Sequence, residues 1–286
     1  MKLTAICAKL VRDQWLTFRG LKYGVLRRRR NRERPPIHLY WWRGVPNFGD
    51  CCTPDLVLAL FGYHSEWTQV NDCDVMGAGS LLELAIFANG TRDSFVWGSG
   101  FIRPDSPTIE TFRYVAVRGK LSAQRLPKES QVIPVGDPGL LANLVYSRGH
   151  QTNKVGLVPH YVDVDHPVVA ALRNDERFVI IDVGDTPAEV ARQISSCSLI
   201  LSSSLHGLVF ADSFGVPNFH LKLSDALTGG DYKFTDYYSA SGRDYTQADI
   251  SQIFDDAYLQ TLRRNWVPFK SLPAIQRGLV RAFPFK

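Results

Sequence analysis

The sequence lacks any Cys-x-x-Cys pair, and its five cysteines are an odd number. Both features argue against a disulfide framework and a cysteine zinc site, and they favour a reducing compartment. No apolar run approaches the roughly 18 to 20 residues that cross a bilayer, and the N-terminus has no compact apolar core of a signal peptide. The histidines also lack His-x-His or His-Glu-x-x-His spacing, so no catalytic metal is predicted.

Positive charge is abundant at the two ends of the chain. Residues 1–34 carry eleven Lys and Arg against two acidic residues, and residues 261–286 carry six and no acidic residue. The net charge of the whole chain is only +5, so the body between the ends is acidic. An enzyme that acts on nucleic acid more often concentrates positive charge around its active site, so no nucleic-acid partner is predicted.

The N-terminal segment, residues 1–36, mixes apolar and basic residues at roughly helical spacing. This pattern suits either a solvated basic arm or a segment that lies on an anionic membrane surface. The basic tail at 251–286 repeats the mixture on a smaller scale, which favours the membrane. We therefore predict a cytoplasmic protein that is peripheral at the inner face of the cell membrane.

Between the two ends, short β-rich segments alternate with helical segments. The first series of predicted strands and turns lies within 37–42, 73–79, 94–101, 111–119 and 131–145, and the second within 154–163, 178–184, 198–204 and 217–223. Such alternation predicts an α/β fold with mainly parallel sheets. Two consecutive series predict two Rossmann-like domains that face a cleft, one at 37–150 and the other at 151–250.

Polar residues gather in five loops that follow predicted strands. These are Asn47 and Asp50, then Gly77, Gly79 and Ser80, then Arg118, then His160, and finally Ser203, Ser204, Leu205, His206 and Gly207. Taken singly, each has a structural explanation, and Asp50 can simply cap the helix that follows it. Together, the arginine, the histidines and the backbone N–H groups at the start of a helix at 205–214 suit a small dianion such as phosphate.

The chain resembles the polysaccharide pyruvyltransferase family over roughly residues 38–222. The resemblance is carried by NFGD, GAGS, AVRGKLS, GDPGLL, VPHYVD and, most specifically, SSSLHGLVFADSFGVPN. The layout is most similar to the bacterial exopolysaccharide ketal-pyruvate transferases. This implies a glycosyltransferase-B-like fold and transfer of the enolpyruvyl group of phosphoenolpyruvate to two hydroxyls of a sugar, forming a pyruvate ketal and releasing phosphate. Phosphoenolpyruvate is then the donor substrate, no cofactor is expected, and a lipid-linked oligosaccharide is the expected acceptor.

The resemblance assigns roles by motif position, and it implies that Arg118 and His206 bind the donor. The predicted donor site also includes His160, Gly77, Gly79, Ser80, Ser203, Ser204, Leu205 and Gly207. His206 and Asp50 are the predicted catalytic residues, and Asp50 would be the base that accepts a hydroxyl proton. The predicted acceptor side consists of Asn47, Trp41 and Trp97, although a Trp can equally pack in a core.

Two positions depart from the family pattern. Many relatives carry Arg where this chain has Ser204, and Gly119 stands where the family has Asp. The first departure removes a cation that would bind the donor. Lys222 or His160 is the predicted replacement.

Two other functions fit the same features. The first is a glycosyltransferase that uses a nucleotide sugar, which the same two-domain architecture would serve. The second is a membrane-associated subunit of a polysaccharide assembly complex without catalytic activity. A shift of the melting temperature by a nucleotide or by phosphoenolpyruvate discriminates the first, and acceptor-dependent release of phosphate excludes the second.

Overall fold

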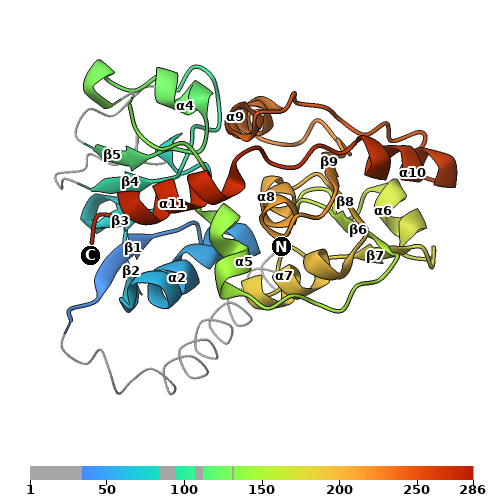
Figure 1. The fold of residues 1–286 in the computed structure, drawn as a ribbon, viewed down its shortest axis with the longest axis horizontal. Coiled ribbons are helices and arrows are strands. Elements are labelled where there is room, and N and C mark those ends of the chain that lie inside the picture. The colour runs from blue at the N-terminus through green and yellow to red at the C-terminus, as the bar shows by residue number, and fades with distance from the viewer. Residues whose placement is uncertain (1–33, 84–93, 107–111, 131, 286) are drawn as a thin grey trace, which may run out of the picture.

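The chain forms two parallel β-sheets with helices packed around and between them (Figure 1). The structure, a computed structural model, describes residues 34–83, 94–106, 112–130 and 132–285. The first sheet has the order β2-β1-β3-β4-β5, with strands β1 (Ile37–Tyr40), β2 (Ser65–Trp67), β3 (Val75–Met76), β4 (Phe95–Trp97) and β5 (Arg113–Ala116). The second has the order β7-β6-β8-β9, with strands β6 (Val155–Val158), β7 (Phe178–Ile180), β8 (Leu199–Ser202) and β9 (Asn218–His220).

Every strand pair in both sheets is parallel. This confirms the predicted α/β class with parallel sheets, whereas the assignment of each sheet to a Rossmann-like domain stays a prediction. Register brings strand ends together: Tyr40 of β1 pairs with Met76 of β3, and Val158 of β6 pairs with Ser202 of β8. The loops that follow these strands therefore all begin at the carboxyl ends of the strands, on the same side of each sheet.

The strand predicted within 131–145 is wrong. Over the described part of this segment, the only pairing is an isolated bridge between Val117 and Val135. Pro134 has no N–H to donate, which limits the ladder. The turn and the helix predicted in the same segment are confirmed, as the 3₁₀ turn η3 (Pro138–Leu141) and the short helix α5 (Ala142–Val145). The apolar sequence SLLELAIFANG at 80–90 predicts a helix, but most of it falls on residues 84–93, outside the described residues.

Helices pack against both sheets. In the first half they include α2 (Phe48–Phe61) and α4 (Lys120–Gln124), and in the second half α6 (Pro167–Leu172), α7 (Pro187–Ser196), α8 (Leu205–Phe214) and α9 (Tyr232–Ser241). In α2, α6 and α7 the N-cap side chain accepts a hydrogen bond from a backbone N–H of the first turn. Thr186 caps α7 by accepting a hydrogen bond from the backbone N–H of Glu189 at 3.3 Å. Gly62 and Gly215 end α2 and α8 in the left-handed conformation that glycine tolerates best.

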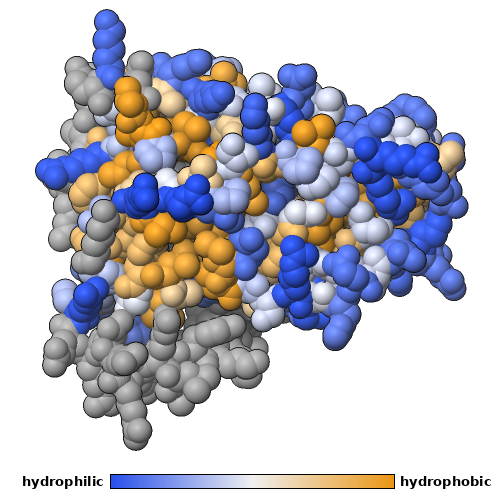
Figure 2. Space-filling model, viewed as in Figure 1, coloured by the Kyte–Doolittle hydropathy of each residue, from blue (hydrophilic) through white to orange (hydrophobic). Residues whose placement is uncertain are grey.

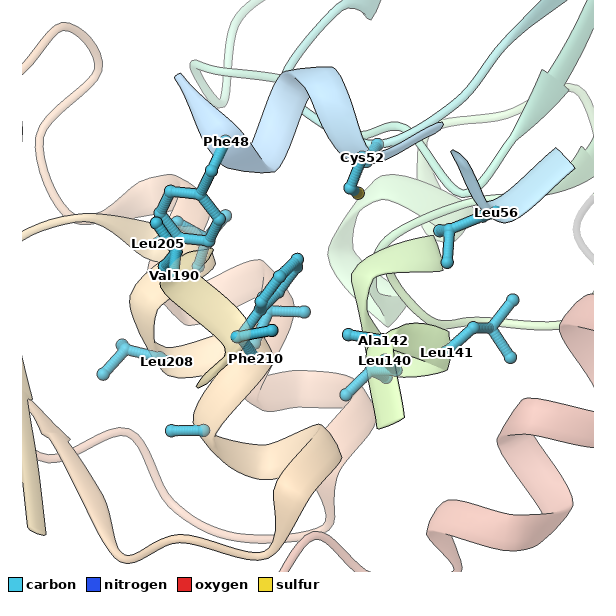
Figure 3. Packing of buried hydrophobic residues seen from close by; sticks show 14 of the residues in the cluster. Phe48, Cys52, Leu56, Leu140, Leu141, Ala142, Val190, Leu205, Leu208 and Phe210 are labelled. Carbon is cyan, nitrogen blue, oxygen red and sulfur yellow. The ribbon is translucent and has the colours of Figure 1, made fainter. Parts of the chain in front are cut away.

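One hydrophobic cluster connects the two sheets. It includes residues of β1 and α2 from the first half and of α7 and α8 from the second. Figure 3 shows the part of the cluster where α2 meets α7 and α8. Phe48 at the start of α2 meets Phe210 of α8 edge to face, with ring centroids 4.8 Å apart. Apolar packing therefore fixes the position of the start of α2 relative to α8.

The C-terminal tail contains α10 (Asp256–Asn265) and α11 (Leu272–Ala282), and α11 lies against the first half of the chain (Figure 1). The indole N–H of Trp97 donates to the carbonyl of Leu279 at 2.8 Å, and the ring of Phe283 stacks on Phe61. The apolar side of this tail thus packs on its own chain. Its basic residues Arg277 and Arg281 are exposed.

In the view of Figure 2, apolar side chains gather over the half that carries β1–β5 and α11, whereas the end that carries α10 is mainly hydrophilic. The predicted basic segment at 1–36 lies almost entirely outside the described residues, so its attachment to a membrane stays a prediction. Among the helices of the described ranges, none has the length and hydropathy to span a bilayer.

Candidate active site

A cavity of about 350 Å³ lies between the two halves and is lined by loops that follow β1, β3, β4, β6 and β8. Small-molecule sites typically occupy ~300–1,000 Å³. Among the predicted residues, those that line it are Asn47, Asp50, Gly79, Ser80, His160, Ser204, Leu205 and His206. Residues that lie more than 100 positions apart in the sequence thus meet in one cleft. This is expected of loops at the carboxyl ends of parallel strands.

The serines that precede α8 divide into two groups. The hydroxyl of Ser202 donates to the carbonyl of Val158 at 2.9 Å, and the hydroxyl of Ser203 donates to Asp163 at 2.7 Å while accepting from the backbone N–H of His160. These two side chains fix the ends of β6 and β8 together. Ser204 instead faces the cleft at the N-terminus of α8, where a helix dipole favours an anion.

His206 lies in the first turn of α8, and only 5% of its surface is exposed. Its ring packs so tightly on α2 that a Cβ at Gly49 would lie 2.0 Å from the imidazole. Its Nε2 is 3.6 Å from a carboxylate oxygen of Asp137. Burial lowers the pKa of His206, but the carboxylates of Asp137 and Asp50 more than offset this, and the pKa is raised overall. The site therefore favours the imidazolium.

Asp50 faces His206 from the first turn of α2. Asn47 caps this helix by accepting a hydrogen bond from the N–H of Gly49 at 3.0 Å. Burial raises the pKa of Asp50 to about 6, although His206 and Lys233 act in the opposite direction. Gly79, at φ +113°, passes so close that a Cβ there would lie 2.5 Å from the Asp50 carboxylate. A carboxylate with this pKa suits proton transfer near neutral pH.

Two basic residues in the cleft were not predicted. Lys233 of α9 is only 8% exposed and lines the cavity. Burial, with the nearby charge of Arg118, lowers the pKa of Lys233 to about 8. Arg103, which follows β4, also lines the cavity and pairs with Glu83 at 3.5 Å. For Lys233, the one feature of the sequence that could have indicated a site is a lysine among the aromatic residues of DYKFTDYY. This segment lies beyond the residues that carry the family resemblance.

Arg118 is fully buried and does not line the cavity. Its guanidinium donates to Asp236 of α9 at 2.9 Å, to the hydroxyl of Ser80 at 2.6 Å and to the carbonyl of Phe101. Asp236 also accepts from the backbone N–H and hydroxyl of Ser122. In this arrangement Arg118 joins the two halves and supports Ser80 from behind. Its predicted direct contact with the donor stays untested.

Arg118→Met should therefore lower the free energy of unfolding by about 3–5 kcal/mol, because it leaves the Asp236 carboxylate buried without its cation. Urea denaturation measures this. Arg192→Met, which removes an exposed arginine paired with Glu189 within α7, is the matched control and should have a much smaller effect. Unchanged stability with loss of phosphoenolpyruvate binding would instead identify the Arg118 guanidinium as a ligand-binding group.

Comparison with known proteins identifies the family. The profile of the family described as polysaccharide pyruvyl transferase matches residues 12–225, which is most of the chain and includes both sheets and the start of α8. The chain belongs to the polysaccharide pyruvyl transferase family. The resemblance predicted from the sequence is thereby confirmed.

Two curated relatives were found. An uncharacterised protein of Acanthamoeba polyphaga mimivirus is 31% identical over 168 residues, covering 55% of this chain and 58% of its own length. The succinoglycan biosynthesis protein ExoV of Rhizobium meliloti is 26% identical over 215 residues, covering 72% of this chain and 65% of its own length. The chain thus spans less than two thirds of either relative.

Among solved structures, an uncharacterised protein of Klebsiella pneumoniae aligns with 12% identity over 74% of this chain and 94% of its own, with a TM-score of 0.43.

In this member of the pyruvyl transferase family, the structure does not place the two predicted acceptor-binding tryptophans at the cavity. Trp97 is completely buried against Phe283, and Trp41 is 6% exposed in the same core. Neither ring lines the cavity, because both are packed in the hydrophobic core beside the first sheet. Trp42, the neighbour of Trp41, lines the cavity instead, together with Tyr161 from the other half.

The remaining predicted residues of this pyruvyl transferase family member lie behind the cavity or outside it, except His160. Gly77 packs on Thr53, and Gly207 packs on Ser202. Lys222 is not among the lining residues, and its ammonium pairs with Asp225 at 2.5 Å. His160 lines the cavity, but burial and the charge of Lys233 lower its pKa to about 4. At neutral pH it is an uncharged hydrogen-bonding group.

Proposed function

We propose that this protein transfers the enolpyruvyl group of phosphoenolpyruvate to two hydroxyls of one sugar in an exopolysaccharide repeat unit and releases phosphate. The observation that carries the proposal is the position of His206, at the start of α8 between the carboxylates of Asp137 and Asp50 and facing a small-molecule cavity. Family membership supports pyruvyl transfer. The name of the relative from Rhizobium meliloti supports a role in exopolysaccharide synthesis.

The donor phosphate would lie at the N-terminus of α8. Helix N-termini present free backbone N–H groups and a partial positive charge to an anion. Ser204 and Leu205 begin this helix at the cavity, and the His206 imidazolium adds a full positive charge. This arrangement would stabilise the departing phosphate, an electrostatic effect that is commonly a large part of catalysis.

The reaction would proceed in two stages. His206 gives its proton to the methylene carbon of phosphoenolpyruvate, which leaves an oxocarbenium-like centre at C2. The first sugar hydroxyl attacks C2, its proton passes to Asp50, and Asp50 returns a proton to His206, so the imidazolium is restored before phosphate leaves. The second hydroxyl then forms the second C2–O bond, the bond from C2 to the phosphate oxygen breaks, and the hydroxyl proton leaves with phosphate.

The acceptor sugar would lie between the aromatic rings of Trp42 and Tyr161, which line the cavity from opposite halves. Tyr161 is partly exposed, so its ring would form an apolar wall where the cavity opens to solvent. Aromatic rings suit the apolar faces of sugars. A sugar carried on a lipid would enter from this side, at the surface of the membrane.

The proposal is tested by phosphate release from phosphoenolpyruvate with a panel of glucosyl, mannosyl and galactosyl acceptors, including lipid-linked ones, and by the mass of the products. We expect release that depends on the acceptor and a product that carries a pyruvate ketal. No release with any acceptor, together with stabilisation by a nucleotide sugar, would favour a glycosyltransferase. No response to either donor would favour a non-catalytic subunit.

A further inference from the structure

Asp137 is a buried carboxylate to which the proposed reaction gives no step. It belongs to the GDPGLL stretch, it is fully buried, and it is not among the residues that line the cavity. Its Oδ1 accepts a hydrogen bond from the backbone N–H of Gly139 at 2.8 Å and so caps η3. Its Oδ2 has no hydrogen-bond partner among the described residues. A buried carboxylate oxygen without a donor is costly, so this oxygen is expected to serve another group.

The imidazole of His206 carries the matching unpaired atom. Its Nε2 is buried, has no hydrogen-bond partner within the described ranges, and lies 3.6 Å from Oδ2 of Asp137. This separation exceeds an ordinary N–H···O bond by only about 0.7 Å, and hydrogen bonds of a catalytic site are often long until a ligand binds. A ring turned over would place a carbon against the carboxylate, so the charge of Asp137 favours the observed orientation.

Both groups are held in place by the packing of η3 on α8. The carbonyl of Leu140 accepts a hydrogen bond from the hydroxyl of Ser213 at 3.0 Å and another from the amide of Gln276 at 2.7 Å. Gly139 lies so close to α8 that a Cβ there would be 2.9 Å from a methyl carbon of Val209. A carboxylate that its surroundings lock in this way is suited to orient a second side chain.

The two nitrogens of the His206 ring have different surroundings. Nε2 faces Asp137 and is covered. Nδ1 lies beside the first turn of α2, where a Cβ at Gly49 would come within 2.0 Å of it. The absence of a side chain at Gly49 therefore leaves room at Nδ1. Because His206 lines the cavity while Nε2 is covered, Nδ1 is the ring nitrogen left for a ligand.

We infer that Asp137 is the positioning residue of His206: it accepts the Nε2–H from behind the ring, and Nδ1 exchanges its proton with the ligand in the cavity. The reaction that uses this proton rests on the proposed function, whereas the orientation of the ring stands on the geometry alone. A carboxylate at Nε2 stabilises the imidazolium, the form that would protonate phosphoenolpyruvate. After that transfer it holds the remaining proton on Nε2, so Nδ1 can take a proton back from Asp50.

Nuclear magnetic resonance of the full chain with ¹⁵N-labelled histidine tests the inference without an assay of activity. His206→Gln identifies the signals of His206 by their loss. In the wild type we expect the pKa of His206 to lie above its ordinary value, and we expect the neutral ring to carry its proton on Nε2. A neutral ring with its proton on Nδ1 would overturn the inference, and this measurement needs no variant of Asp137.

Asp137→Asn separates the orientation of the ring from the folding of η3. Asparagine keeps an oxygen for the N–H of Gly139 and caps a helical turn about as well as aspartate does, so circular dichroism should show the wild-type fold. The amide nitrogen then takes the place of Oδ2 and donates to Nε2 of His206. The pKa of His206 should fall, and its neutral ring should carry the proton on Nδ1 instead.

Asp255→Asn is the matched control. Asp255 is exposed and caps α10 by accepting a hydrogen bond from a backbone N–H at 2.8 Å, so its exchange should leave the His206 ring unchanged. The other charged and titratable groups that face His206 are Asp50 of α2, His160 after β6 and Lys233 of α9. None of them is altered in Asp137→Asn, so the change in the His206 pKa is assigned to Asp137.

Asp137→Asn should also lower kcat for phosphate release by more than about 100-fold, with a smaller change in the KM for phosphoenolpyruvate. The imidazolium is then scarcer at neutral pH, and Nδ1 of the neutral ring already holds a proton and cannot take one back. Steady-state phosphate release measures both constants, and Asp255→Asn should have wild-type values.

An unchanged pKa and an unchanged proton position of His206 in Asp137→Asn would overturn the inference and leave the proposed function standing. Loss of activity with an unchanged ring would likewise overturn it and would assign Asp137 to the fold of η3 alone. A proton moved to Nδ1 in a protein whose wild type releases no phosphate with any acceptor would uphold the inference and overturn the proposed function.

Discussion

Replacing His206 with glutamine should lower kcat for pyruvyl transfer by more than about 100-fold, because the variant has neither a transferable proton nor a positive charge at the start of α8. Glutamine keeps the length and a hydrogen-bonding group, so the packing against Gly49 and Phe48 is largely preserved. Steady-state phosphate release measures the rate, and circular dichroism checks the fold. His64→Gln, which changes an exposed histidine outside the cavity, should have the wild-type rate.

The same variant distinguishes two roles for His206. If it protonates the methylene carbon, kcat falls while the KM for phosphoenolpyruvate changes little. If it mainly binds the phosphate, kcat and the affinity for the donor fall together. A near-normal rate would contradict both roles and remove His206 from the catalytic residues.

Loss of the imidazolium has a second consequence at Asp50. The charge of His206 lowers the pKa of Asp50 against the larger effect of burial. In His206→Gln the Asp50 pKa should therefore rise further above 6. The residual activity of this variant should then have its acidic limb at higher pH than the wild-type activity has, which the loss of an uncharged histidine would not produce.

The sequence was informative where local pattern and strand order decide the position of a residue. Asp50, His160 and His206 each follow a predicted strand, and the carboxyl ends of parallel strands meet at one edge of a sheet. Their gathering at the cavity follows from the alternating pattern alone. The two short sheets also follow from it, except for β2, whose Ser-Glu-Trp sequence has no apolar alternation to indicate a strand.

The sequence was uninformative where a contact joins distant segments. Arg118 was predicted to face a ligand, but its partner Asp236 lies 118 residues away on α9, and no local pattern announces that pair. The same helix brings Lys233 into the cavity. The side chain of a tryptophan such as Trp97 or Trp42 can pack in a core or against a sugar equally well. Only the packing of α11 on the first sheet decides that Trp97 is buried.

Replacing Asp50 with asparagine should lower kcat/KM by about 10²–10⁴-fold, because asparagine cannot accept the hydroxyl proton. In the wild type, kcat/KM should rise with pH through about 6, the pKa to which burial raises Asp50, and then level off. The residual rate of Asp50→Asn should lack this limb. Phosphate release between about pH 5 and pH 8 measures both profiles. Asp165→Asn, an exposed neighbour of the loop after β6, should keep the wild-type profile.

Stability should change in the opposite direction to activity. Because the pKa of Asp50 is raised in the folded state, the fold binds its proton more tightly than the unfolded chain does. The wild type therefore loses stability as the pH rises from about 4 to about 6. An asparagine carries no charge to bury, so at pH 7.5 Asp50→Asn should be more stable than the wild type by roughly 2–3 kcal/mol. Urea denaturation at pH 4 and pH 7.5 should show this gain only at the higher pH. A loss of stability at both would mean that the carboxylate serves the fold rather than the reaction, because a group kept for catalysis is expected to cost stability.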